Sequence, residues 1–244
     1  MRDLVLHCGA KNVGLNDLKE IEMPAQTDTY IPISHYDMAF NVNKVAQDLL
    51  VPKGYKFVKE QYGLGREGQR LFGVFQFRNG QPDMGMAVGF RNSYDKSMSA
   101  GLCIGAQVFV CDNLAFNGDI VVMRKHTKNV LEDFQAELIQ AVYKSVNNFD
   151  LVVNAMARMK TIDITDDDAY KAIGMLAGHE ILTSTEVNET FRQWRKPSYD
   201  AFTDRNVYSL YNAATCALRT APPHRLYEAH AGLHETVVKY FNVA

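Results

Sequence analysis

The 244-residue chain carries 26 Lys and Arg residues against 28 Asp and Glu, which leaves a formal net charge of −2, and 47% of its residues are hydrophobic. This balance excludes a disordered tail protein, a collagen-like repeat, a disulfide-dense secreted scaffold and a uniformly basic histone-like binder. No run approaches the roughly 20 consecutive apolar residues of a membrane helix, and charged residues interrupt the N-terminal segment before a signal-peptide core. We expect a cytoplasmic protein with reduced cysteines and no membrane partner.

Residues 1–33 begin with a short apolar run at residues 4–6 and continue through glycines and prolines, which indicates a strand and an irregular lead-in. Ser34 is a typical helix N-cap, with Asp37 three residues later. Apolar residues then repeat at helical spacing until Pro52 and Gly54, which predict the end of this helix.

Residues 55–126 are rich in Gly, Val, Phe and Tyr, and turn-forming residues separate their short apolar runs. Asn79-Gly80 and Asn117-Gly118 are hairpin signals because a type I′ turn needs two residues that tolerate positive φ. The GLGREG segment, residues 63–68, also fits a hairpin turn, whereas a dinucleotide-binding loop would have to open a helix. The pattern predicts an antiparallel meander whose run at residues 101–111 is central and buried on at least one face.

Beyond His126, apolar residues at steps of three and four predict one long helix over a face of the sheet: Leu131, Phe134, Leu138, Val142, Val146, Phe149, Val153 and Met156. Four helical patterns follow, at residues 165–179, 184–196, 204–220 and 223–241, the first with capping-box spacing. The expected fold is α+β: an antiparallel β-meander covered by a long helix, followed by a C-terminal helical region. We expect a core domain over residues 1–160, with a helical region packed on it over residues 161–244.

The charge is uneven along the chain: residues 1–43 carry −3, residues 44–130 carry +5, residues 131–190 carry −7 and residues 191–244 carry +3. Each segment could simply present a solvated face. Alternatively, the basic sheet and the basic C-terminal helices form a groove that follows a phosphate backbone, with Phe90, Tyr94 or Trp194 stacking on bases. The candidate DNA-binding residues are Arg91, Tyr94, Lys96, Arg124, Lys125, His126, Lys128, Arg192 and Arg195.

Motifs for catalysis or metal binding are weak. Asp163 and the run at residues 166–168 lack the spacing of an EF-hand and fit a helix N-terminus better than a divalent ion. His230 and His234 are four residues apart, but neither a third ligand nor the glutamate of a zinc-protease motif accompanies them. We expect no enzyme activity, no metal and no cofactor.

Several small motifs follow one another along the chain. They are Asn92, Ser93, Tyr94 and Asp95; Val110, Cys111, Asp112, Asn113 and Leu114; His126 and Thr127; and, in a later helix, Leu210, Tyr211, Asn212, Ala213 and Thr215. Through these motifs, residues 92–130 and 207–218 resemble the phage- and plasmid-borne family called domain of unknown function 932. That resemblance implies a protein of a mobile element, connected with incoming single-stranded DNA or with host defence.

The predicted helix, meander and long helix are also similar to the core of single-strand annealing proteins of the Redβ and Erf type. We therefore expect a non-enzymatic, homo-oligomeric protein of the host-cell cytoplasm that binds or anneals single-stranded DNA. One alternative is an interaction protein that inhibits a host defence complex through the acidic helices of residues 131–190. A metal-dependent nuclease is a third possibility, which the missing carboxylate constellation disfavours.

Overall fold

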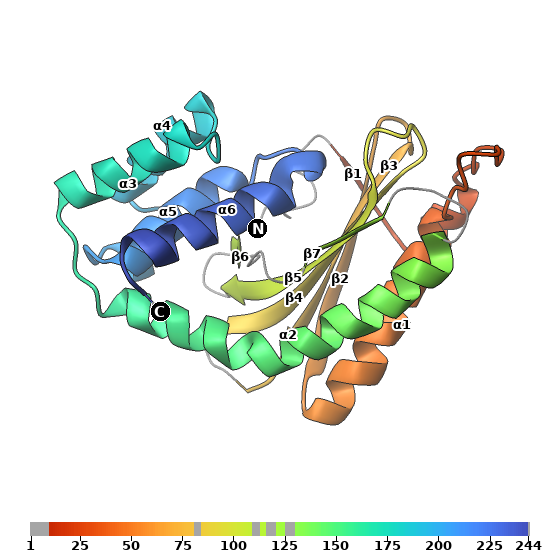
Figure 1. Cartoon of the computed structure of the whole chain (residues 1–244), viewed down its shortest axis with the longest axis horizontal. Helices are drawn as coiled ribbons and strands as arrows, with labels where there is room; N and C mark the ends of the chain where they lie inside the picture. Colours follow the sequence, from red (N-terminus) through yellow and green to blue (C-terminus); the bar gives the residue numbers. More distant parts are fainter. Residues whose placement is uncertain (1–9, 81–83, 109–112, 116–120, 125–129, 244) are drawn as a thin grey trace. The chain divides into compact units, whose positions relative to one another are not determined.

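The computed structural model of the chain (Figure 1) describes residues 10–80, 84–108, 113–115, 121–124 and 130–243. The chain divides into two compact units. The first comprises Met1–Gly105 and Ile120–Asn147, and the second comprises Ala106–Asp119 and Asn148–Ala244. The division thus falls inside the long helix instead of after residue 160, and a short segment from the meander belongs to the second unit.

Within these described ranges the strands form one seven-stranded sheet, in which β1 to β6 are neighbours in chain order and β7 pairs with β5. The pairs β1–β2, β2–β3, β3–β4, β5–β6 and β5–β7 are antiparallel, so the antiparallel meander expected from the sequence is confirmed. The strands are β1 (Lys11–Val13), β2 (Lys56–Gly65), β3 (Arg70–Arg78), β4 (Met84–Ser93), β5 (Ala100–Val108), β6 (Asn113–Ala115) and β7 (Val121–Arg124).

The first helix, α1 (His35–Leu50), begins where the sequence predicts it. The Ser34 hydroxyl accepts a hydrogen bond from the Asp37 backbone N–H at 3.2 Å, which satisfies one of the free donors of the first turn. A short 3-10 helix follows, and Gly54 ends it with a φ of +87°. α1 contacts β3 and β4 and therefore lies on the sheet of the first unit.

An aromatic cluster fills the face of the meander that α1 covers. The Phe90 ring lies 5.1 Å from the Phe75 ring and 6.3 Å from the Tyr62 ring, measured between centroids. Gly73 lies opposite both Tyr62 and Phe90 in the strand pairing. A Cβ at this glycine would be 2.1 Å from the Phe90 ring. The Phe90 ring can therefore occupy this position only because residue 73 has no side chain.

The GLGREG segment is the hairpin turn between β2 and β3, as the sequence predicts. Arg66, Glu67 and Gly68 all have positive φ, at 48°, 53° and 88°. Two of them are not glycine, so the turn holds a conformation that ordinary side chains adopt at some cost. The expected strand at residues 4–6 and the Asn117-Gly118 turn lie outside the described residues.

The long helix α2 spans Val130–Lys160 and confirms the helix expected after His126. Its first half belongs to the first unit, where Leu138 and Val142 are buried. The second unit contains the remaining four predicted helices: α3 (Asp166–Gly178), α4 (Ser184–Arg195), α5 (Val207–Leu218) and α6 (Pro223–Tyr240). None of the described helices has the length and apolar character needed to cross a membrane.

Two capping boxes start α3 and α4. In α3, Thr165 and Asp168 bond reciprocally, and in α4 Thr183 and Glu186 do the same. Glu186 also receives two hydrogen bonds from the Arg225 guanidinium, at 2.8 and 2.7 Å. Because Glu186 is buried, this bidentate ion pair fixes α6 against the start of α4 inside the second unit.

A buried histidine in α6 makes the stability of the second unit depend on pH. Burial lowers the pKa of His230 to about 3, and the charge of Arg225 contributes in the same direction. In the unfolded chain an imidazole titrates near about 6.5. Between these two values the unfolded state binds more protons, so stability falls as the pH falls. We expect a loss of about 2 kcal/mol from this residue between pH 7 and pH 5.

Urea unfolding at both pH values, followed by circular dichroism, checks this expectation. His230→Leu removes the titrating group, so the variant should lose about 2 kcal/mol less than the wild-type chain over the same interval. Equal losses in the two proteins would contradict a neutral buried imidazole.

Candidate nucleic-acid interface

Two of the expected DNA-binding residues lie inside the first unit. Arg91, in β4, and Tyr94, just after β4, are each only 4% exposed. Phe90 and Trp194, the other rings expected to stack on bases, are 0% and 1% exposed. These side chains therefore offer no surface to a nucleic acid in this structure, which corrects the expectation of an aromatic stacking platform.

Tyr94 instead packs against the start of α1. Its ring is parallel to that of His35, with centroids 3.8 Å apart, and its hydroxyl oxygen accepts a hydrogen bond from the His35 backbone N–H at 2.8 Å. Burial raises the pKa of Tyr94, which keeps the phenol neutral. Tyr94 thus holds the start of α1 against the end of β4.

A polar network surrounds the same histidine. Its Nε2 lies 3.0 Å from the Gly68 carbonyl oxygen, which can only accept, so Nε2 carries the proton. Its Nδ1 is then an acceptor for the Asn92 side-chain N–H at 3.0 Å, and the same amide donates to the Ile33 carbonyl at 2.7 Å. We call His35, Asn92 and Tyr94, with the Gly68 carbonyl, the histidine network. It joins α1, the β2–β3 turn and β4.

The other two residues of the Asn-Ser-Tyr-Asp motif also make structural bonds. The Ser93 hydroxyl donates to the Met98 carbonyl at 2.9 Å and accepts from the Met98 N–H at 3.1 Å, which closes the β4–β5 turn. Partial burial disfavours the charge of Asp95, but hydrogen bonds from Ser97 and Arg70 outweigh it and lower the pKa of this carboxyl. The motif that carries the family resemblance thus organises the fold.

The remaining candidates are distributed over both units. Lys96 is exposed in the first unit, with its Nζ 4.6 Å from the centre of the Tyr30 ring. In the second unit, Arg192 donates two hydrogen bonds to Glu189, at 2.7 and 2.6 Å, and Arg195 lies over the Tyr170 and Phe191 rings. Arg124 ends β7 opposite Ala100, and Lys125, His126 and Lys128 lie outside the described residues.

Strand pairing gathers three other cations that the sequence analysis missed. Lys56 of β2 lies directly opposite Arg78 of β3, and Lys59 lies opposite Gln76, two residues from Arg78. All three cationic side chains are exposed, on the face of the hairpin opposite to Phe57 and Phe77. We call Lys56, Lys59 and Arg78 the basic face. Lys56 and Arg78 thus place like charges on paired residues, an arrangement that by itself destabilises a strand pair.

The basic face also has a plain structural interpretation. Among the described residues, β1 pairs with β2 only at Tyr62–Leu64, so residues 56–61 of β2 form an open sheet edge. Lysines and a bulge are common means of preventing such an edge from pairing with another strand, and the pairing register shifts between Phe57 and Lys59. Counting outward from the turn at GLGREG predicts that Lys59 pairs with Gln76. The bulge that shifts the register and pairs Lys56 with Arg78 could not be predicted from the sequence.

Two carboxylates of the acidic run in the second unit make internal contacts. Asp168 forms the capping box of α3, and Asp166 accepts a hydrogen bond from the Trp194 indole at 2.9 Å and lies 3.9 Å from Arg205. The helix-capping interpretation of this run is thereby confirmed. Within the described part of the chain, no group of three or more His, Cys, Asp or Glu residues could hold a metal ion.

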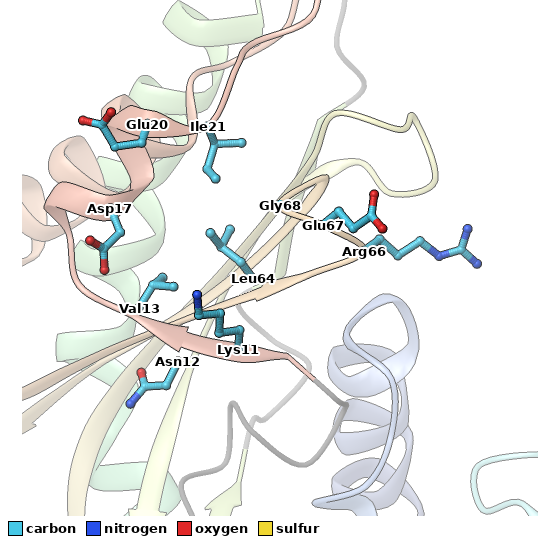
Figure 2. Close-up of a pocket in the computed structure, with 10 residues that line it drawn as sticks. All are labelled: Lys11, Asn12, Val13, Asp17, Glu20, Ile21, Leu64, Arg66, Glu67 and Gly68. Atoms are coloured by element: carbon cyan, nitrogen blue, oxygen red, sulfur yellow. The ribbon is translucent and has the colours of Figure 1, made fainter.

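A hollow of about 570 Å³ opens in the first unit beside the β2–β3 turn (Figure 2). Its walls come from β1, the 3-10 helix Asn16–Glu20, the end of β2 and the turn itself. Lys11, Asp17 and Leu64 are among the side chains that line it. This volume lies within the usual range of small-molecule sites.

Comparison of the chain with family models, with curated proteins and with solved structures finds no match. The resemblance in residues 92–130 and 207–218 therefore stays a prediction.

The histidine network predicts the effect of a single substitution. Asn92→Leu keeps the size of the side chain but removes both donors, so the Ile33 carbonyl and the His35 Nδ1 lose their buried partner. We expect the free energy of unfolding to fall by about 3 kcal/mol, measured by urea denaturation.

Asn188→Leu, the same change at an exposed position in α4, is the matched control and should change stability by about 0.5 kcal/mol or less. A similarly small change in Asn92→Leu would show that the network contributes little to the fold.

Proposed function

We propose that this protein is a non-enzymatic single-stranded-DNA-binding and annealing protein, and that the basic face contacts the phosphate backbone. The observation that carries the proposal is the register of β2 and β3, which places Lys56 opposite Arg78 and Lys59 on the next rung of the same face. A row of exposed cations along a strand matches the repeating charges of an extended nucleic-acid strand.

The burial of the aromatic candidates bears on how such binding would work. Phe90 and Tyr94 are inside the first unit and Trp194 is inside the second, so the backbone charge supplies the affinity and stacking on these rings does not. When the protein contacts a strand only through its phosphates, the bases of that strand stay exposed for pairing with a second strand. Binding of this kind has little sequence preference and weakens as salt increases.

The proposal includes self-association. Two large side chains one turn apart on α2, Ile139 and Tyr143, are 47% and 55% exposed. An apolar pair on an outer helix face is a suitable contact between copies of the chain. Self-association would place several basic faces along one DNA strand.

Fluorescence anisotropy with a labelled oligo-dT of about 30 nucleotides tests the proposal. The variant Lys56→Gln/Lys59→Gln/Arg78→Gln should bind about tenfold more weakly or worse, and its plot of log affinity against log salt should be shallower by about 2. Native mass spectrometry of the same samples gives the number of copies for each oligonucleotide.

The matched control removes three exposed lysines elsewhere in the chain: Lys144→Gln/Lys171→Gln/Lys239→Gln. It loses the same charge and should keep its affinity within about twofold. Equal weakening in both variants would assign the effect to net charge. Absence of binding at micromolar protein in low salt would overturn the proposed function.

A further inference from the structure

The hollow beside the β2–β3 turn has walls that the fold holds in place. The Asp17 carboxylate accepts the Gly14 backbone N–H at 2.7 Å and fixes the start of the 3-10 helix, and the neighbouring Leu18 is buried. On the other side, the His35 ring binds the Gly68 carbonyl. The hollow is therefore bounded by anchored elements before any ligand arrives.

The lining combines an apolar gap with charges of both signs. Figure 2 shows Ile21 and Leu64 pointing toward each other across the hollow, and the Lys11 ammonium extending to its edge beneath Leu64. Among the described residues, neither Lys11 nor the second oxygen of Asp17 has a bonding partner. The site thus offers two aliphatic walls, an unpaired hydrogen-bond donor and an unpaired acceptor.

This combination discriminates between classes of ligand. A simple anion such as phosphate would meet the Asp17 carboxylate, and a simple cation would meet the Lys11 ammonium. A flat, neutral ring with donors and acceptors on its rim avoids both conflicts. It can lie between Ile21 and Leu64 while an ammonium donates to its carbonyl or ring nitrogen and a carboxylate accepts from its amino group.

We propose that this hollow binds a single nucleobase. The inference goes beyond the proposed function and does not rest on the basic face, which lies on the opposite side of the sheet from Leu64. The hollow can therefore be tested without DNA.

The test uses free deoxyguanosine and deoxycytidine, with binding measured by saturation-transfer NMR on the full chain. We expect dissociation constants on the order of 1 mM. Lys11→Met removes the ammonium, and Val13→Trp fills the hollow; each should weaken binding by about tenfold or more. Lys19→Met changes a lysine outside the lining and should have no effect.

Because Lys11 is exposed, Lys11→Met should fold, and its affinity for the nucleosides can be measured even if Val13→Trp does not fold. Deoxyribose 5-phosphate, which has the phosphate and no base, should not compete. Competition by this sugar phosphate, absence of nucleoside binding at about 10 mM, or binding unchanged in Lys11→Met would each overturn the inference.

The oligo-dT titration separates the two proposals. Nucleoside binding without oligonucleotide binding would support the hollow and overturn the proposed function. Oligonucleotide binding without nucleoside binding would leave the basic face supported and overturn the nucleobase site.

Discussion

The first unit depends on one buried polar contact, the histidine network. His35 uses both ring nitrogens, one toward the Gly68 carbonyl and the other toward the Asn92 amide, while its ring face covers Tyr94. Since these partners come from the β2–β3 turn and from the end of β4, the imidazole sets the position of α1 on the sheet and the shape of the turn together. Buried polar groups are costly unless they are satisfied, so this arrangement tolerates few alternatives. The Glu186–Arg225 pair has a comparable place in the second unit, where it joins a helix start to α6.

This constraint explains why the Asn-Ser-Tyr-Asp motif, which carries the family resemblance, has a structural role in the first unit. Asn92, Ser93, Tyr94 and Asp95 are all engaged in internal bonds, so a motif that resembles a family marker reflects the requirements of a fold. Two surfaces remain for binding. The hollow lies beside the network, with Gly68 in its wall, whereas the basic face lies at the far end of the same hairpin. Both are shaped by the β2–β3 hairpin, whose turn the network holds in place.

Elements with strong local signals could be predicted from the sequence. Ser34 with Asp37 marked the start of α1, Thr165 with Asp168 marked α3, and periodic apolar residues marked the length of α2. The candidate site was harder, because Arg91 and Tyr94 look like surface residues in a basic segment, and only the three-dimensional packing shows that they are buried. The basic face was missed for a related reason: a bulge sets its register, and one-residue shifts in pairing are invisible to alternation patterns.

The central claim is that single-stranded DNA lies on the basic face, and lysine footprinting tests it most directly. Acetylation of the full chain with and without oligo-dT, followed by mass spectrometry, reports the accessibility of each lysine in the folded protein. Lys56 and Lys59 should lose reactivity when the oligonucleotide is bound, whereas Lys171 and Lys239, exposed in the second unit, should keep theirs. Bound DNA with Lys56 and Lys59 unprotected, or with protection confined to Lys171 and Lys239, would contradict the claim.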